Sequence, residues 1–262
     1  MTTNNDQDHT IPLDHPRYES LKYRHKIIEG MKKLVVAEAG LIAHGRGECF
    51  DYMLGEKTNE TAKEAIKAAV AMLLTAAHAI ISVNGNTAAL CPNDLVELSK
   101  ILNAPLEINL FYRKEGRVEA IKKVLQDAGA KKILGLDEQS MVEIEELTSN
   151  RRNVDPNGIK IADVVFVPLE DGDRTEALKK MGKKIVAVDL NPISRTSLEA
   201  DVTIVDNIIR VVPEMIKIAK KLKNTNEKEM KSIIEKFDNK KNIQLTLDTI
   251  IKYTKKQKKK FL

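Results

Sequence analysis

Six short runs rich in β-branched and other apolar residues alternate with amphipathic stretches through the middle of the chain. This alternation constrains the fold more than any other feature. The runs span residues 79–83, 106–111, 132–136, 163–167, 184–188 and 202–205, and helical patterns lie between several of them, notably at 93–102, 116–128 and 175–181. Such a pattern predicts right-handed βαβ crossovers and a mainly parallel sheet. We therefore expect an α/β fold.

Helical segments are expected on both sides of this core. One helix is predicted from about residue 14 to 36, and a second, buried helix from 58 to 78. After residue 207 the chain is predicted to be helical to its end, with interruptions at 224–226 and 238–242, whereas 137–160 is predicted to form a short helix and a loop. We find no internal repeat or clear linker, and 262 residues fit one domain. We expect three parts: 1–78 mainly helical with a Gly-rich loop, 79–207 the sheet core, and 208–262 helical and Lys-rich.

Positive charge is concentrated at the C-terminal end. The net charge is +5, but residues 217–262 alone contain 15 Lys and 5 acidic residues, a balance of +10. Such a segment could attract nucleic acid. It has no Arg and only three aromatic residues, so we favour a solvated helical surface and no nucleic-acid partner. The polar N-terminus lacks an apolar signal core, and the longest apolar run, 68–77, is too short to cross a bilayer. We expect a cytoplasmic protein with no membrane partner.

The segment 40–51, GLIAHGRGECFD, combines glycines with ionisable side chains and is poorly suited to building a core. Gly45 and Gly47 would let the backbone approach a ligand closely. Arg46 can clamp an anionic oxygen with its planar fork of donors, while His44 and Glu48 can transfer or orient protons. The segment therefore predicts part of a site for a phosphorylated small molecule.

Polar residues also follow three of the predicted strands. Asn84 begins an Asn-Gly-Asn turn after the first strand, Asp189 and Asn191 follow the fifth, and Asn207 follows the sixth. Ligands of open parallel sheets bind beyond the carboxyl ends of the strands. Each cluster alone would equally suit an ordinary turn, but three clusters on one edge favour a ligand site. An acidic turn at 170–173 could hold Mg²⁺ through water, although an ordinary turn explains it more simply.

Several longer blocks resemble one known family. They are HPRYESL, GLIAHGRGECFDYMLGE, ISVNGNTAAL, ADVVFVPLEDGDRTEALKKMGKK and DLNPISRTS. Between about His15 and Pro213 the chain resembles the archaeal 4-phosphopantoate–β-alanine ligases, also called phosphopantothenate synthetases. The resemblance implies a Rossmann-like core, a homodimer and a step of coenzyme A biosynthesis. In that step ATP, 4-phosphopantoate and β-alanine would give 4′-phosphopantothenate, AMP and pyrophosphate.

The resemblance also implies which residues contact ATP. The family's pattern falls on the first helix, the HGRG segment, the DLN and SRT residues after the fifth strand, and the pair that follows the last strand. These residues are Arg24, Arg46, Asp189, Leu190, Asn191, Arg195, Thr196, Asn207 and Ile208.

The family's chemistry agrees with the residue types. The pantoate carboxylate would attack the α-phosphate of ATP to form a mixed anhydride with AMP, and the β-alanine amine would then displace AMP. Because both stages bring anions together, we expect fixed positive charge and Mg²⁺. His44, Glu48 and Asn84 are expected to orient phosphopantoate, to bind its phosphate or to receive the amine proton, and their individual roles stay open. Arg17 is a candidate contact for the substrate phosphate.

Two other classes of function remain as minor alternatives. A sheet that ends in Asn and Asp turns would also suit a nicotinamide-dependent oxidoreductase, but NGNTAAL lacks the third glycine of the dinucleotide fingerprint. A nucleic-acid-binding protein would use the basic C-terminal segment, and its binding would weaken steeply with salt.

Overall fold

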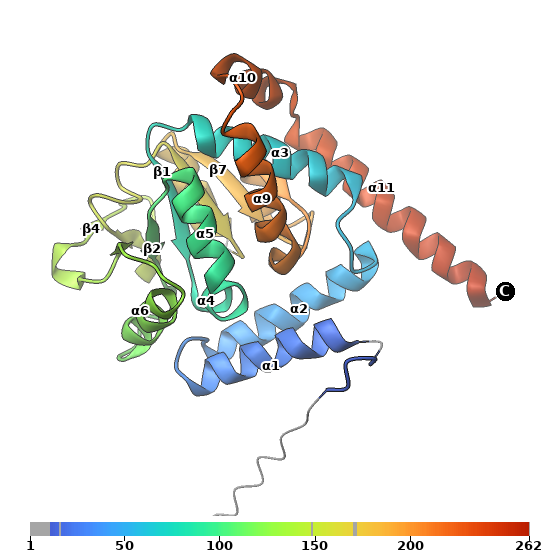
Figure 1. The fold of residues 1–262 in the computed structure, drawn as a ribbon, viewed down its shortest axis with the longest axis horizontal. Helices are drawn as coiled ribbons and strands as arrows, with labels where there is room; N and C mark the ends of the chain where they lie inside the picture. Colours follow the sequence, from blue (N-terminus) through green and yellow to red (C-terminus); the bar gives the residue numbers. More distant parts are fainter. Residues whose placement is uncertain (1–10, 16, 148, 170–171, 262) are drawn as a thin grey trace, which may run out of the picture.

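A six-stranded parallel sheet forms the centre of the computed structural model, which describes residues 11–15, 17–147, 149–169 and 172–261. The strand order is β3-β2-β1-β6-β7-β8, so the chain starts in the middle and winds outward in both directions, as in Rossmann-like folds (Figure 1). All six predicted strands are confirmed. Their bounds are β1 Ala79–Val83, β2 Leu106–Ile108, β3 Ile133–Leu134, β6 Val164–Pro168, β7 Lys184–Val188 and β8 Val202–Ile204.

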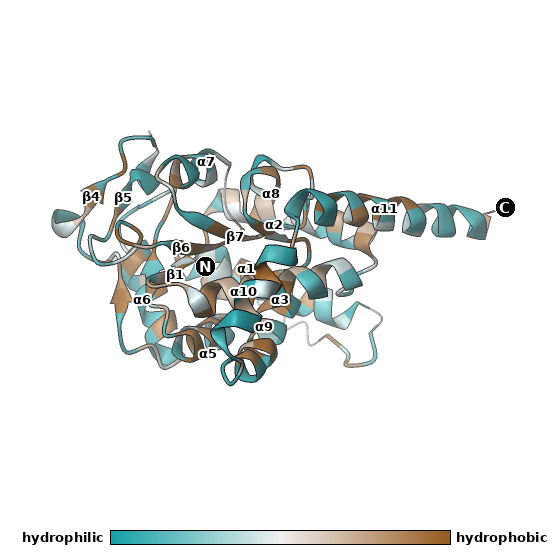
Figure 2. Cartoon of the chain, turned by 90° about the horizontal axis from the view of Figure 1, so that it is seen from above, coloured by the Kyte–Doolittle hydropathy of each residue, from teal (hydrophilic) through white to brown (hydrophobic). Residues whose placement is uncertain are grey.

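Helices cover both faces of the sheet, because side chains that alternate along each strand are apolar on both sides. In β1, Ile81 and Val83 pack into the larger core, while Ile80 packs into the smaller one. The larger core lies under α3 (Glu60–Thr75), α5 (Pro92–Leu102), α6 (Arg117–Asp127) and α9 (Ile208–Leu222). The opposite face carries α7 (Gly172–Lys180) and α8 (Arg195–Glu199) (Figure 2).

The N-terminal part is a pair of helices, α1 (Tyr18–Lys32) and α2 (Glu38–Leu54), which lies across the end of the sheet toward which the strands run (Figure 1). The Gly-rich segment 40–51, expected as a loop, lies inside α2, so this prediction was wrong. The helix ends at Gly55, which adopts the left-handed conformation (φ 82°) that caps helices well. At Gly40 the glycine has a packing role, because an added Cβ would lie 2.4 Å from Oδ1 of Asn86.

The segment 137–160 also differs from its prediction. In place of one short helix and a loop, it contains a small antiparallel sheet of β4 (Val142–Glu143) and β5 (Asn153–Val154), with 3-10 turns at Glu138–Ser140 and Asn150–Arg152. Glu107 of β2 holds this segment against the sheet. Its buried carboxylate accepts hydrogen bonds from the backbone N–H groups of Asp155 (3.0 Å) and Ile159 (2.6 Å). Burial raises the pKa of Glu107 to about 7.

After α9, the chain continues as α10 (Glu227–Lys236) and α11 (Asn239–Lys258), and α11 projects away from the body (Figures 1 and 2). The first turn of α11 completes the edge of the sheet at Thr203 of β8. Asn239 accepts the backbone N–H of Thr203 (2.8 Å), and Asn242 donates to its carbonyl oxygen (2.8 Å). Among the helices of the described residues, none combines the length and the apolar character needed to cross a membrane.

Candidate active site

A cavity of about 200 Å³ opens at the carboxyl end of the sheet, beneath α2. It lies where β1 and β6 are neighbours and the chain winds away in opposite directions, which is where open α/β sheets bind ligands. Loops after five strands contribute to it. The lining includes Gly40, His44, Gly47 and Glu48 of α2, residues 84–86 after β1, residues 110–112 after β2, Leu169 after β6, Leu190 after β7, and Asn207 and Ile208 after β8.

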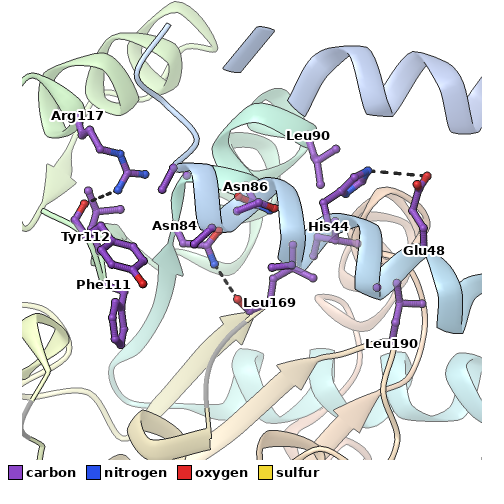
Figure 3. Close-up of a pocket in the computed structure, with 18 of the residues that line it drawn as sticks. His44, Glu48, Asn84, Asn86, Leu90, Phe111, Tyr112, Arg117, Leu169 and Leu190 are labelled. Atoms are coloured by element: carbon purple, nitrogen blue, oxygen red, sulfur yellow. Dashed lines mark hydrogen bonds and ion pairs between the residues drawn. The ribbon is translucent and has the colours of Figure 1, made fainter. Parts of the chain in front are cut away.

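Asn84 forms the floor of the cavity at the junction of β1 and β6. It caps α4 (Gly85–Leu90), where its Oδ1 accepts the N–H of Thr87 (3.0 Å). Its Nδ2 donates to the carbonyl oxygen of Pro168 (2.9 Å) and to that of Leu169 (3.1 Å), the second of which is drawn in Figure 3. Through the Nδ2 bonds, Asn84 ties the two central strands together and shapes the cavity.

His44 and Glu48 lie one helical turn apart on α2 and face the cavity together (Figure 3). Glu48 accepts hydrogen bonds from Nη2 of Arg24 (3.2 Å) and from Oγ of Ser20 (3.1 Å), both on α1. Nε2 of His44 lies 3.9 Å from Oε1 of Glu48. Burial lowers the pKa of His44, the Glu48 carboxylate opposes this effect, and the Arg24 charge reinforces it. The net effect favours the neutral form of this imidazole, which lies beside a carboxylate.

None of the predicted arginines is among the described residues that line the cavity. Arg17 donates to the hydroxyl groups of Ser20 and Tyr52 on the outer side of the α1–α2 pair. Arg46 is exposed on α2, and its positive charge acts on the carboxylate of Asp189. Arg195 turns away toward α7, where it pairs with the carboxylates of Asp173 (2.6 Å) and Glu176 (2.6 Å). The other two acidic residues of the predicted Mg²⁺ turn, 170 and 171, lie outside the described residues.

The turn after β7 is held by its own polar residues. Asp189 accepts hydrogen bonds from the N–H of Asn191 (2.9 Å) and from the hydroxyl of Ser194 (2.5 Å). Burial raises the pKa of Asp189, and these hydrogen bonds together with the charge of Arg46 oppose it. Asn191 closes the turn by accepting the N–H of Ile193 (3.0 Å). The turn directs Leu190 into the cavity lining, whereas Thr196 is buried in α8.

A charged network holds α2 over the edge of the sheet. Asp51 of α2 accepts two hydrogen bonds from the guanidinium group of Arg210 and one from Nδ2 of Asn207 (2.8 Å). Arg210 also binds Asp206, whose second oxygen accepts the hydroxyl proton of Thr58 (2.6 Å). This network joins α2, the loop before α3 and the end of β8, and it places Asn207 beside the cavity.

Sequence reasoning missed the wall after β2. Phe111 and Tyr112 pack edge to face with ring centroids 4.8 Å apart, and both line the cavity. Arg117 lies behind them and donates to the carbonyl oxygens of Tyr112 and Val35, which joins this wall to the turn between α1 and α2. Arg151 adds a buried guanidinium group to the lining. The predicted strand 106–111 was three residues too long, and this concealed the aromatic pair.

No group of three or more His, Cys, Asp or Glu side chains suited to binding a metal occurs within the described residues. Mg²⁺ commonly keeps several waters and binds through substrate phosphates with one or two carboxylates. Asp189, in the turn after β7, is a carboxylate that fits such a role.

Comparisons with known proteins agree with one another. Residues 61–253 match the family described as phosphopantothenate/pantothenate synthetase. A 4-phosphopantoate–β-alanine ligase of Thermococcus kodakarensis is 56% identical over 230 residues, which cover 87% of each chain. A protein of the same name from Methanosarcina mazei is 46% identical over 245 residues, covering 94% of this chain and 96% of the relative.

Proposed function

The chain belongs to the phosphopantothenate/pantothenate synthetase family, and on this premise we propose that it joins 4-phosphopantoate to β-alanine at the expense of ATP. It is a carbon–nitrogen ligase, and its product would be 4′-phosphopantothenate, a precursor of coenzyme A. The observation that supports a location for the reaction is the cavity between α2 and the junction of β1 and β6. The homodimer and the cytoplasmic location stay predictions from the sequence.

We propose an acyl-adenylate route. A carboxylate is a poor acylating agent, so the pantoate carboxylate would attack the α-phosphate of ATP and expel pyrophosphate. The amine of β-alanine would then attack the acyl carbon and release AMP. Holding the reacting groups in line inside a small cavity supplies much of the rate acceleration in reactions of this kind.

The positions of the residues support different binding roles for them. Arg46 acts electrostatically on Asp189, in the turn that carries Leu190, and would bind the ATP phosphates. Asn207 lines the cavity and would bind the nucleoside. Arg24, which donates a hydrogen bond to Glu48, would reach the phosphates from α1. Arg195 would have to leave its two carboxylate partners to reach a nucleotide, so its contribution is expected to be smaller.

The test is a product analysis with omissions. The purified protein is incubated with ATP, Mg²⁺, 4-phosphopantoate and β-alanine, and the nucleotide and amide products are separated by chromatography. We expect AMP and the amide in equal amounts, and neither product when any one component is left out. Formation of ADP in place of AMP would contradict the adenylate route, and amide formation without ATP would contradict the ligase.

A further inference from the structure

His44 and Glu48 are polar side chains of the cavity to which the protein leaves binding capacity. Asn84 and Asn207 use both atoms of their amide groups in hydrogen bonds, and Arg117 is committed to backbone carbonyls. Nε2 of His44 is buried and forms no hydrogen bond with any residue that the structure describes. The side chains of His44 and Glu48 are only 12% and 14% exposed, so a ligand that reaches them meets groups with little competing water.

The charges around this pair select the kind of ligand. Glu48 accepts hydrogen bonds from Arg24 and Ser20 of α1, and each carboxylate oxygen still has a lone pair for a further donor. The neighbouring residues of α4 that line the cavity, Asn86 and Leu90, are uncharged. Arg24 contacts the Oε2 atom of Glu48, whereas His44 lies beside Oε1. On the His44 side an anion would be repelled by the Oε1 atom, whereas a cation would be attracted by it and could donate a proton to His44.

The inference rests on the proposed function. Among the charged chemical groups that the three substrates carry, one fits this charge pattern. ATP and 4-phosphopantoate carry phosphate and carboxylate groups, and the ammonium of β-alanine is the cation. We infer that His44 and Glu48 form the site of the β-alanine ammonium, in which Glu48 binds it and His44 accepts the proton that must leave before nitrogen can attack.

The step balances as follows. The ammonium nitrogen gives one proton to Nε2 of His44 and becomes a neutral amine with a free electron pair. That pair forms a C–N bond with the acyl carbon, and the C–O bond to the phosphate of AMP breaks, so the phosphate oxygen keeps its electron pair. The second proton leaves the nitrogen for water or the departing phosphate, and the imidazolium then returns its proton to water.

The experiment separates the two half-reactions in His44→Gln. Exchange of labelled pyrophosphate into ATP, measured with 4-phosphopantoate and no β-alanine, reports adenylate formation. Amide formation with β-alanine reports the second step, and hydroxylamine, which is largely unprotonated at neutral pH, replaces β-alanine in a third assay. We expect exchange and hydroxamate formation to fall far less than amide formation, which should be reduced by about 10²–10⁴-fold, the usual contribution of a general base.

Two further variants complete the design. His78→Gln makes the same change at an exposed histidine at the opposite end of β1, and we expect it to behave as wild type in all three assays. Glu48→Gln should raise the KM for β-alanine more than it changes the exchange rate. The exchange rate also reports folding, because a misfolded variant would lose it.

The outcomes are distinct. Amide formation near the wild-type rate in His44→Gln would overturn the inference, as would an equal loss of exchange, hydroxamate and amide. Absence of exchange in the wild type would overturn the adenylate route itself, and the inference with it. Loss of amide formation alone, with hydroxamate formation retained, would support the assignment.

Discussion

Replacing Arg210 by Met should destabilise the protein strongly, because Arg210 neutralises two buried carboxylates. The side chains of Asp51 and Asp206 are 8% and 1% exposed, and both accept hydrogen bonds from its guanidinium group. Removing one partner of a buried ion pair typically costs about 3–5 kcal/mol, because the remaining charge loses its compensation. The Arg210 side chain is 23% exposed, so water can replace part of the lost interaction. We therefore expect a loss near the lower limit, roughly 3 kcal/mol.

Urea-induced unfolding followed by circular dichroism at neutral pH measures this loss. Arg195→Met is the matched control, since Arg195 also pairs with two carboxylates but its side chain is 60% exposed. Water screens exposed pairs, so the control should change the free energy of unfolding much less than Arg210→Met does. Equal losses in the two variants, or a loss below about 1 kcal/mol for Arg210→Met, would refute the view that this network fixes α2 to the sheet.

Three further predictions concern single residues. Gly45→Ala should raise the free energy of unfolding by about 0.5–1 kcal/mol, because no atom lies within 4 Å of the added Cβ and glycine disfavours a helix; a loss of stability in thermal unfolding would argue against the helix. Glu107, with its pKa raised from 4.5 to about 7 by burial, favours folding most when it is protonated. As the pH rises from about 4.5 through 7, the free energy of unfolding of the wild type should therefore fall by roughly 3 kcal/mol relative to that of Glu107→Gln. Parallel profiles of unfolding free energy against pH for the two proteins would contradict this. Arg46→Ala should reduce pyrophosphate release about 10²–10³-fold with an unchanged circular dichroism spectrum, and near-normal turnover would remove Arg46 from the mechanism.

The sheet was predictable from sequence because its strands are continuous apolar runs. β1, β6 and β7 are buried on both faces, so their composition alone marks them. The strands β4 and β5 were missed because each has only two residues, too few to show any periodicity. Their position depends on the hydrogen bonds of Glu107, a contact between residues about fifty positions apart.

The error at 40–51 has a different origin. Glycine-rich sequence favours loops locally, but the segment is held as a helix by distant contacts, including the ion pair of Asp51 with Arg210 and the pair of Glu48 with Arg24. As a result His44 and Glu48, four positions apart, share one face, which a loop would not ensure. The sequence predicts these residues as candidates for the site, but only the helix reveals their relative positions.

The same limit applies to the arginines. Sequence can predict that Arg195 binds a phosphate, but in the structure it pairs with carboxylates of α7. The position of α7 beside Arg195 depends on the order of the strands in the sheet. The aromatic wall of Phe111 and Tyr112 is visible only once β2 ends at Ile108.

A crystal structure of the protein with 4-phosphopantoate and an ATP analogue whose α–β bridge cannot be cleaved would test most directly where the chemistry occurs. We predict that the α-phosphate and the pantoate carboxylate will meet in the cavity between His44 of α2 and the loops that carry Asn84 and Leu190. Density for the nucleotide elsewhere, such as the groove between α3, α10 and α11, would contradict the account.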